Sequence, residues 1–376
     1  MTLENETVTV GLESNGYDIH IGPNQLERLG DLYKSQIGQR HAIVITDNNV
    51  AEHYLSEVLN ALRSVANRVD KIVVEAGEKS KSIQQCDALW QKMMELKADR
   101  SSVVVALGGG VVGDLAGFAA AGFMRGIPFI QIPTSLMAQV DSSVGGKTGV
   151  NLPQGKNLVG AFHQPEFVLI QTTTLETLDE ANFCAGMAEV IKYGMIMDAD
   201  FFEFLESNAD KIVNRDEKVL RQMIATCCRC KARVVEEDER ETTGRRAILN
   251  YGHTFGHAVE AVFGYGKYLH GQAVAIGMRC AARLAETQGL ISQEVVDRQN
   301  RLLDRVGLTH KLGTEKHEQI LTAMKNDKKS AGGAPQLILP DRLGNVNLYD
   351  WPGDELVKTA LVEPCLLYTS PSPRDS

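Results

Sequence analysis

The sequence predicts an α/β fold, with a parallel sheet in the first half of the chain and a mostly α-helical second half. Its 376 residues exceed what one ordinary hydrophobic core accommodates, so two domains are expected. Apolar runs of strand length alternate with helical patterns up to about residue 178, which is typical of crossover units and a doubly wound parallel sheet. Beyond that point the apolar periodicity is mostly helical.

The elements are expected in the following order. Apolar runs at residues 41–47, 70–78, 101–110 and 128–135 predict strands, and the run at 167–178 closes this region. Helical patterns separate them at 49–65, 82–100 and 111–124. In the second half, helices are expected at 181–198, 216–239, 256–264, 272–289 and 292–307.

We predict three segments: an α/β domain over residues 1–178, a helical domain over 179–364 and a non-native tail over 365–376. The tail, CLLYTSPSPRDS, is abruptly rich in Ser and Pro, as disordered segments are. It also resembles the translation of a sequencing-library adapter. A ligand is expected at the carboxyl ends of the strands, in the cleft between the two domains.

Composition and charge exclude several classes of protein. The formal net charge of −9 provides no basic field for a nucleic-acid binder. Lysines that cluster locally could still bind an anionic substrate. The sequence contains no run of about 18 apolar residues, so no membrane span is predicted, and no secretory signal is visible at the N-terminus. Seven cysteines without such a signal favour a reducing, cytoplasmic compartment.

The strongest local signal in the first half is VVVALGGGVVGD, a strand that runs into three glycines and then a helix. Such a turn lets backbone N–H groups approach a pyrophosphate at the helix N-terminus. Glycines for tight packing are the alternative, because neither the G-x-G-x-x-G spacing nor a Walker lysine is present. Asp47 at a strand end can bind a ribose hydroxyl or cap a helix, and Lys81 lies in a predicted loop. Together these features favour nucleotide binding.

The segment 139–160 contains five glycines and two lysines. Gly145 and Gly146 precede Lys147, and Gly155 precedes Lys156. We interpret this backbone as shaped around an anion, with the lysines supplying charge and the neighbouring asparagine a neutral donor. A solvated surface loop is the alternative for either lysine alone.

Glu189 and Lys192 lie three residues apart in AGMAEVIKYG and share one face of an expected helix. Apolar neighbours indicate that this helix is largely buried, and a buried carboxylate needs a cation or a metal. An ordinary surface ion pair is the alternative.

Three histidines lie within eighteen residues of LNYGHTFGHAVEAVFGYGKYLHGQ. His253 and His257 have the i, i+4 spacing of zincin helices, but threonine stands where the general base of those proteases is needed. Spacing alone nominates this pair as metal ligands with His270 as a third candidate, and satisfied core or surface histidines are the alternative. Two histidines with Glu189 and an open position also make a reasonable catalytic zinc set.

Six motifs are distributed along the chain, and each occurs once: GGGVVGDLAGFAAAGFMRG, IPTSLMAQVDSSVGGKTGVN, GKNLVGAFHQP, GMAEVIKYG, LNYGHTFGHAVE and LHGQAVAIGM. Together they resemble the motifs of the 3-dehydroquinate synthases, within the sugar phosphate cyclase family. The resemblance extends from Asp47 to the segment LILPDRLG, and DSSVGGKT with GHTFGHA is its most specific part.

The resemblance implies a Rossmann-like N-terminal domain that binds NAD and a helical C-terminal domain that holds one divalent metal, zinc or cobalt. It implies conversion of an anionic sugar acid phosphate, 3-deoxy-D-arabino-heptulosonate 7-phosphate (DAHP), into 3-dehydroquinate and phosphate, in the shikimate pathway of aromatic amino acid biosynthesis. NAD would be reduced and regenerated around the phosphate elimination, before an intramolecular aldol reaction closes the ring. A homodimer is the usual form of such enzymes.

By the same resemblance, the metal ligands are Glu189, His253 and His270. The residues expected around NAD are Asp47, Asn49, Glu78, Lys81, Gly109, Gly110, Val111, Asp114, Thr134, Ser135, Lys147, Lys156, Thr174 and Thr177. The residues expected to contact the substrate are Asp141, Lys147, Asn157, Lys192, Arg246, Asn250 and His257, with Arg125 reaching into a neighbouring subunit's site. The run after Lys231 is one residue longer than in the family, so Arg245 and Arg246 compete for one position.

Three alternatives remain. A metal-dependent polyol dehydrogenase has the same architecture, but the lysine-rich segment argues against it because a polyol carries no phosphate. Another sugar phosphate cyclase, making an aminocyclitol or valiolone precursor, differs only subtly in its site. A catalytically inactive NAD-binding regulatory module is disfavoured by the intact set of one glutamate and two histidines.

Overall fold

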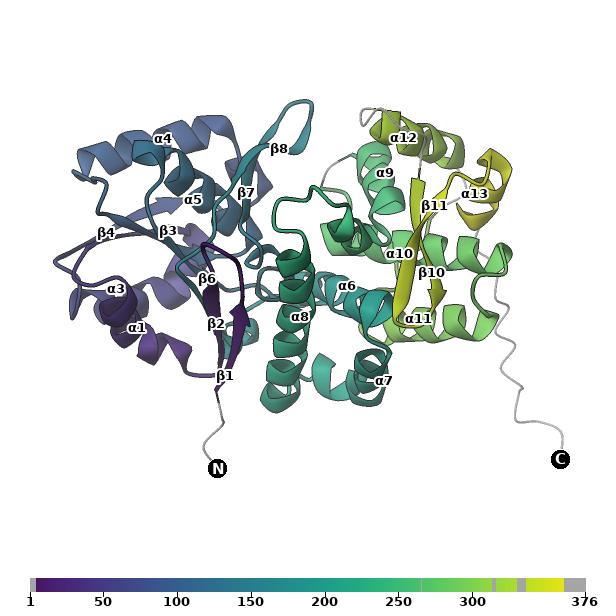
Figure 1. Cartoon of the computed structure of the whole chain (residues 1–376), viewed down its shortest axis with the longest axis horizontal. Helices are drawn as coiled ribbons and strands as arrows, with labels where there is room; N and C mark the ends of the chain where they lie inside the picture. The colour runs from purple at the N-terminus through teal and green to yellow at the C-terminus, as the bar shows by residue number, and fades with distance from the viewer. Residues whose placement is uncertain (1–4, 265, 313–315, 330–335, 362–376) are drawn as a thin grey trace.

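A computed structural model of the chain describes residues 5–264, 266–312, 316–329 and 336–361 (Figure 1). The tail predicted at 365–376 lies outside the described residues. The strands are β1 (Glu6–Val10), β2 (Tyr17–Gly22), β3 (His41–Asp47), β4 (Arg68–Val74), β5 (Val103–Gly108), β6 (Phe129–Pro133), β7 (Lys147–Leu152), β8 (Gly155–Phe162), β9 (Phe167–Gln171), β10 (Gln336–Arg342) and β11 (Asn345–Asp350).

The helices alternate with the first strands and then dominate the second half. They are α1 (Leu29–Gln36), α2 (Asn48–Val50), α3 (Ser56–Arg63), α4 (Ile83–Glu95), α5 (Gly110–Gly122), α6 (Glu180–Met197), α7 (Ala199–Val213), α8 (Glu217–Glu237), α9 (His253–Phe263), α10 (His270–Thr287), α11 (Gln293–Arg305), α12 (His317–Lys329) and α13 (Asp354–Leu361). Shorter helical turns are η1 (Gln25–Arg28), η2 (Ala51–Leu55), η3 (Glu78–Ser80), η4 (Phe123–Arg125), η5 (Ala138–Ser142), η6 (Thr172–Glu176) and η7 (Arg245–Asn250).

Seven strands form one sheet in the order β1-β2-β9-β6-β5-β3-β4. Every neighbouring pair is parallel except β1 and β2. The chain leaves β3 for the edge strand β4 and then returns to β5 on the other side of β3. The carboxyl ends of β3 and β5 therefore frame the crevice in which doubly wound sheets bind their ligands.

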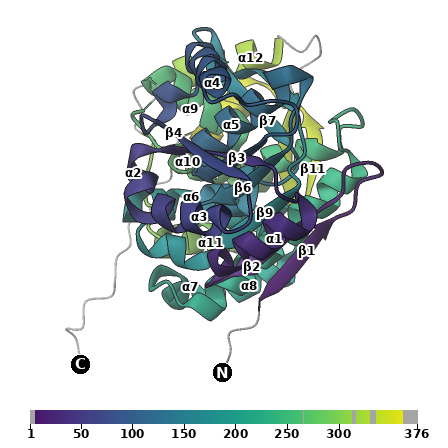
Figure 2. The ribbon, with the colours of Figure 1, turned by 90° about the vertical axis from the view of Figure 1, so that its left-hand side faces the viewer.

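Helices cover both faces of this sheet (Figures 1 and 2). Side chains of α1 and α3 pack in one core cluster with Val44 and Val105. Side chains of α4 and α5 pack in a second cluster with Ile45 and Val104. Successive strand residues thus enter opposite layers, and a strand buried on both faces is a continuous apolar run, as VVVALG of β5 is. The predicted α/β fold with a parallel sheet is confirmed.

The second half is mostly helical and contains one two-stranded sheet, β10 with β11. Its core continues onto the outer strands, because side chains of α6 and α8 share one cluster with Val8, Ile19 and Ile170 of β1, β2 and β9. The division predicted at residue 178 falls between η6 and α6 and stays a proposal. No helix in the described part of the chain has the length and apolarity that a membrane span requires.

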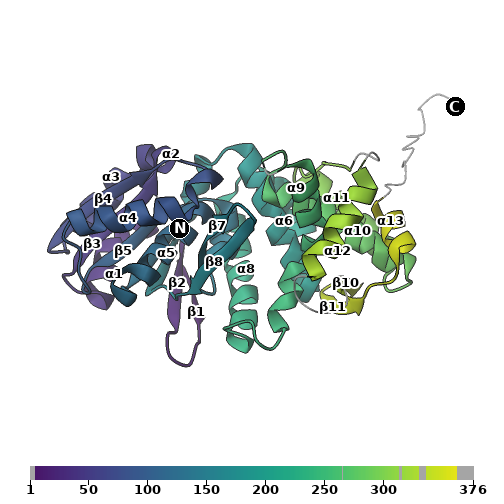
Figure 3. The same ribbon diagram turned by 90° about the horizontal axis from the view of Figure 1, so that it is seen from above.

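Three antiparallel pairs were not predicted from the sequence: β1-β2, β7-β8 and β10-β11. The glycine-rich segment 139–160, expected to be a loop around an anion, forms η5 and the hairpin of β7 and β8. Val150 anchors this hairpin, because it packs with side chains of α4 and α5. Seen from above, the hairpin projects toward the helical half (Figure 3).

Candidate active site

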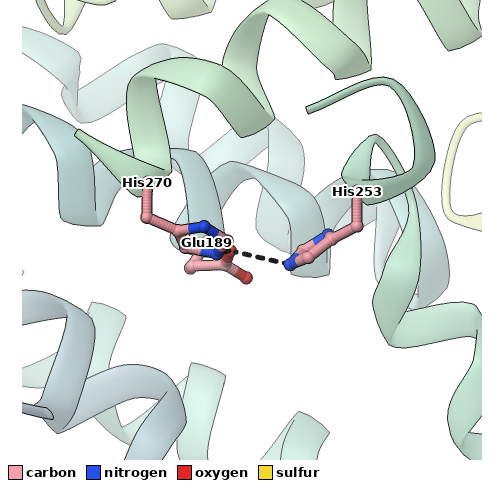
Figure 4. Close-up of side chains that lie close together, drawn as sticks. All are labelled: Glu189, His253 and His270. Atoms are coloured by element: carbon pink, nitrogen blue, oxygen red, sulfur yellow. Dashed lines mark ion pairs between the residues drawn. The ribbon is translucent and has the colours of Figure 1, made fainter. Parts of the chain in front are cut away.

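Three side chains from different helices converge on one point. Glu189 lies in α6, His253 is the first residue of α9 and His270 is the first residue of α10 (Figure 4). Glu189 Oε1 lies 3.4 Å from His253 Nε2 and 3.8 Å from His270 Nε2. A tetrahedral ion with bonds of about 2.1 Å separates its ligand atoms by roughly 3.4 Å, so this spacing suits one metal ion.

Two close backbone contacts of α10 bring these helices together. A Cβ on Gly271 would lie 1.8 Å from the carbonyl oxygen of Ala185, one turn before the glutamate on α6. A Cβ on Gly277 would lie 1.9 Å from the carbonyl oxygen of Gly252, the residue before α9. Only glycine permits both approaches, and α10 therefore starts beside the other two ligand candidates.

The imidazole hydrogen bonds direct a nitrogen lone pair of each ring toward Glu189. His253 Nδ1 lies 3.2 Å from the carbonyl oxygen of Tyr251, and so it donates its hydrogen there. His270 Nδ1 lies 3.1 Å from Glu260 Oε2 and donates to that carboxylate. In the neutral rings Nε2 is then the acceptor.

Glu189 is 1% exposed, and neither of its oxygens accepts a well-directed hydrogen bond from a described residue, although Lys192 forms an ion pair with Oε2. A buried carboxylate facing two nitrogen lone pairs needs a cation between them. The donor set, one carboxylate and two imidazoles, therefore fits a divalent metal.

Burial and charge act differently on the two imidazoles. Burial, together with the charge of Lys192, lowers the pKa of His253 well below its ordinary value, so this ring is neutral, as a metal ligand must be. Burial also lowers the pKa of His270, but the hydrogen bond to Glu260 and the charge of Glu189 outweigh it and raise the pKa. The carboxylates thus favour positive charge at His270, whether from a proton or a metal.

His257 lies beside this group and is exposed. Its ring centre is 5.4 Å from that of His253 and 5.9 Å from that of His270. With Glu260 and His270 it forms a second group of three candidate ligands. The i, i+4 spacing therefore places both histidines of α9 at the site, while the buried Glu189 groups with His253 and His270.

Sequence reasoning missed Glu260, which is 3% exposed. It follows His253 by seven residues and His257 by three on α9, and this shared helical face was the available signal. Burial raises the pKa of Glu260, but His270 and Lys156 outweigh it and lower the pKa to about 2. Glu260 is therefore a carboxylate within the site.

A cluster of buried charges adjoins the metal-ligand candidates. Lys192 on α6 and Lys231 on α8 are 1% and 6% exposed. Lys231 Nζ lies 2.9 Å from Asp141 Oδ1, and the hydroxyl of Tyr193 donates to the same oxygen at 3.0 Å. Burial raises the pKa of Asp141, but the charges of Lys231 and Lys192 outweigh it and hold the pKa below its ordinary value. Two cations are thus shielded from water beside the ligand set.

The structure distinguishes Arg245 from Arg246. Arg246 is 1% exposed, its Nη1 donates to the carbonyl oxygen of Glu239 at 2.8 Å, and Asp141 is among the charges that act on it. The Arg245 side chain is 40% exposed and forms a surface ion pair with Glu237. Of the two, Arg246 belongs to the buried charge cluster.

The hairpin of β7 and β8 carries two predicted lysines to the helical half. Lys147 Nζ lies 2.6 Å from Glu241 Oε2, and half of the lysine side chain is exposed. Lys156 Nζ lies 2.8 Å from Glu260 Oε1, and that carboxylate is buried. The hairpin thus bridges the two halves of the molecule beside the metal-ligand candidates.

Lys81 connects the hairpin to the helix that follows the glycine turn. It is 5% exposed and forms an ion pair with Asp114 of α5. Its Nζ also donates to Asn157 Oδ1 at 2.5 Å. Three residues predicted from separate motifs therefore meet in one polar contact.

The predicted nucleotide residues gather at the carboxyl edge of the sheet. Gly109 caps α5 directly after β5, and Thr134 and Ser135 follow β6. Asp47 ends β3 and accepts the N–H of Val50 at 2.9 Å, so it caps α2 in this structure. The other predicted residues near this edge are Gly110 and Val111 in the first turn of α5, and the exposed Asn49 and Glu78.

Thr174 and Thr177 lie in and after η6. Thr174 is buried and its Oγ1 donates to the carbonyl oxygen of Gln171 at 2.8 Å, while Thr177 Oγ1 lies 2.6 Å from the hydroxyl of Tyr54. Arg125 and Asn250 are exposed at the ends of η4 and η7. A role for Arg125 in a neighbouring subunit stays a prediction.

Two family profiles match this chain. The profile described as 3-dehydroquinate synthase N-terminal matches residues 71–185, and the one described as 3-dehydroquinate synthase C-terminal matches residues 186–330. The 3-dehydroquinate synthase of Desulforamulus reducens is 48% identical over 344 residues, which are 91% of this chain and 96% of that protein. That of Rhodopirellula baltica is 45% identical over 368 residues, 96% of this chain and 98% of that protein.

Solved structures share the whole fold. A 2-deoxy-scyllo-inosose synthase complexed with carbaglucose-6-phosphate, NAD+ and Co2+ has a TM-score of 0.85 at 28% identity, over 95% of this chain and 99% of that one. A 2-epi-5-epi-valiolone synthase from Streptomyces hygroscopicus with NAD+ and Zn2+ bound has a TM-score of 0.84 at 25% identity, over 93% and 97%. A 1,3-propanediol oxidoreductase, at 12% identity and a TM-score of 0.68 over 95% and 99%, shares the fold alone.

Proposed function

The chain belongs to the 3-dehydroquinate synthase family, and we propose that it converts DAHP into 3-dehydroquinate and inorganic phosphate as a lyase that eliminates phosphate. The observation that carries the proposal is the position of one metal-ligand set beside buried cations. Glu189, His253 and His270 provide the donors, and Lys192 adjoins them. A polyol substrate needs the metal-ligand set but not the buried cations, whereas a sugar acid phosphate uses both.

We propose NAD and one divalent metal, zinc or cobalt, as cofactors. Bound metal would polarise the substrate hydroxyls, and NAD would take up and return one hydride in each turnover. The one-glutamate, two-histidine set would hold the metal, and the carboxyl ends of β3, β5 and β6 would hold NAD. Relatives solved with NAD+ and Co2+ or Zn2+ support this assignment.

The buried cations are suited to the carboxylate and phosphate of the substrate. Lys192 and Arg246 are each 1% exposed, so their hydrogen bonds to an anion would be shielded from water and strengthened. Lys147 is half-exposed and paired with Glu241, so substrate would replace that carboxylate as its partner. The chain's own residues thereby bind and orient the substrate, which is much of what this reaction requires.

Replacing Arg246 by alanine is expected to lower kcat/KM for DAHP by roughly 10²-fold or more, because a buried charged donor costs about 2–5 kcal/mol when it is removed. Arg245→Ala is the matched control, since it removes an exposed guanidinium from a surface ion pair and is expected to change kcat/KM by less than about threefold. Steady-state kinetics of both variants provide the measurement. Equal losses would contradict the assignment of Arg246 to the site.

His257→Ala is expected to keep one bound metal per chain and to lower kcat by about 10²-fold, because we propose that His257, exposed beside the candidate ligands, contacts substrate. His270→Ala is the comparison and is expected to lose the metal. Metal analysis after dialysis, with kinetics on the same samples, separates the two roles. Loss of metal from His257→Ala alone would reverse the ligand assignment.

The proposed function is tested by incubating the purified chain with DAHP, NAD and zinc while phosphate and NADH are followed. Phosphate release without net NADH is the expected result. NADH in proportion to substrate would identify a dehydrogenase, and the absence of turnover on DAHP would reject the proposal. Testing the sugar phosphates used by other cyclases in the same assay addresses the second alternative.

We further propose a cytoplasmic homodimer. All six cysteines in the described part of the chain are free thiols, which suits a reducing compartment. Arg125, exposed at the end of η4 in the sheet half, would then reach the partner's site. Mixing an inactive Lys192 variant with an inactive Arg125 variant is expected to restore part of the activity if sites are shared, and no restoration would reject the shared site.

A further inference from the structure

Glu260 is buried where the hairpin of β7 and β8 meets the helical half. It is 3% exposed. Its Oε2 accepts a hydrogen bond from His270 Nδ1 at 3.1 Å, and its Oε1 accepts one from Lys156 Nζ at 2.8 Å. Each carboxylate oxygen therefore holds a different residue of the site.

His270 depends on such a contact more than the other histidine ligand does. The His270 side chain is 35% exposed, whereas that of His253 is 12% exposed and its Nδ1 is held by a backbone carbonyl. Both histidines are first residues of their helices, so the difference lies in their exposure and in the partner of Nδ1. Packing therefore restricts the His270 ring less than the His253 ring, and the contact with Glu260 supplies the remaining restraint.

We propose that Glu260 is a positioning residue that holds His270 in the orientation and tautomer required for metal binding. The proposal rests on the proposed function, because it concerns the metal of that same site. With Nδ1–H donated to Glu260, the Nε2 lone pair of His270 faces Glu189. A carboxylate partner also increases the basicity of the imidazole and strengthens its bond to a metal.

Lys156 makes the arrangement stable. A carboxylate buried without a cation is costly, and the hairpin supplies that cation at 2.8 Å. The same lysine follows the glycine of the segment predicted to bind an anion. Glu260 thus connects the metal-ligand candidates to the hairpin of β7 and β8.

A different role for Glu260 makes a different prediction. His257, Glu260 and His270 also offer three atoms within 4.8 Å of one another, so Glu260 is a second candidate for direct metal binding. That arrangement would replace at least one of the hydrogen bonds that Glu260 accepts from His270 and Lys156, and it would not use the buried Glu189. A positioning role weakens metal binding when Glu260 is changed, whereas a ligand role also makes His257 necessary.

The test is a metal titration of the full-length protein without substrate. Zinc dissociation constants are measured by competition with a chromophoric chelator for wild type, Glu260→Gln and Glu260→Ala. We expect a weakening of about 10-fold for glutamine, which keeps the shape but loses the charge, and of about 100-fold for alanine. The d–d absorption of bound Co2+ is expected to keep its intensity in Glu260→Gln, because the ligands themselves are unchanged.

Glu206→Gln is the matched control. Glu206 accepts hydrogen bonds from Arg298 in the same helical half, so its loss removes a carboxylate ion pair that includes none of the candidate metal ligands. Its zinc dissociation constant is expected to match wild type. Thermal unfolding of the metal-free variants separates loss of metal affinity from loss of structure.

Two outcomes would overturn the proposal. One is a zinc dissociation constant in both Glu260 variants equal to that of wild type. The other is complete loss of zinc from Glu260→Gln and from His257→Ala alike, which would make Glu260 a ligand. Turnover of DAHP by wild type tests the proposed function separately, since the titration contains no substrate.

Discussion

Replacing Glu189 by glutamine is expected to remove the bound metal and to lower turnover of DAHP by about 10³-fold or more. The amide keeps the size of the side chain but loses the charge on which two imidazole nitrogens converge, at 3.4 and 3.8 Å. A metal that polarises substrate oxygens contributes several kcal/mol, and each 1.4 kcal/mol is about tenfold in rate.

Metal content after dialysis and turnover at saturating DAHP provide the two measurements for Glu189→Gln. Glu203→Gln is the control, because Glu203 lies on the neighbouring helix α7 with 64% of its side chain exposed. It is expected to retain metal and wild-type turnover. A Glu189→Gln protein with one tightly bound zinc and normal turnover would exclude Glu189 as a ligand.

Replacing Lys192 by methionine is expected to destabilise the metal-free protein by about 3–5 kcal/mol, because removal of one partner leaves a buried charge uncompensated. Lys192 forms an ion pair with Glu189, and both residues are 1% exposed. Burial lowers the pKa of Lys192, but the charges of Glu189 and Asp141 outweigh it and raise the pKa, so the ammonium form is the one that is lost. Methionine retains most of the side-chain volume, so the effect reports charge rather than a cavity.

Zinc is expected to restore part of this loss, because a cation on Glu189 compensates the carboxylate that Lys192 no longer faces. Urea unfolding with and without zinc measures the difference. Lys218→Met on α8 is the control, since Lys218 is exposed and its removal is expected to change stability by less than about 0.5 kcal/mol. Equal stabilities of the two metal-free variants would show that Lys192 carries no buried charge compensation.

Much of the fold follows from local sequence patterns. The run VVVALG predicts a strand buried on both faces, and helical periodicity marks α6, α8, α10 and α11. Both predictions are confirmed. The strand was recognisable because burial on both faces demands an uninterrupted apolar run. The three antiparallel pairs were missed, because β1, β8 and β11 are exposed along much of their length and so lack the continuous apolar run that marks the strands buried on both faces.

The family resemblance and the cofactor types were also available from motifs, and the family profiles and relatives confirm the family. Spacing correctly placed Glu189 and Lys192 on one helical face. Spacing could not choose between Arg245 and Arg246, because adjacent residues differ only in which one the surrounding structure buries.

By itself, the sequence determined the α/β architecture, the family and the residue types that the chemistry requires. Only the tertiary structure decided which atoms meet. The close approaches at Gly271 and Gly277 bring three helices together around Glu189, and the buried contact of Glu260 orients His270. The physical reason is that sequence spacing specifies neighbours along one helix, whereas this group of candidate ligands takes one atom from each of three helices whose separation is set by backbone packing.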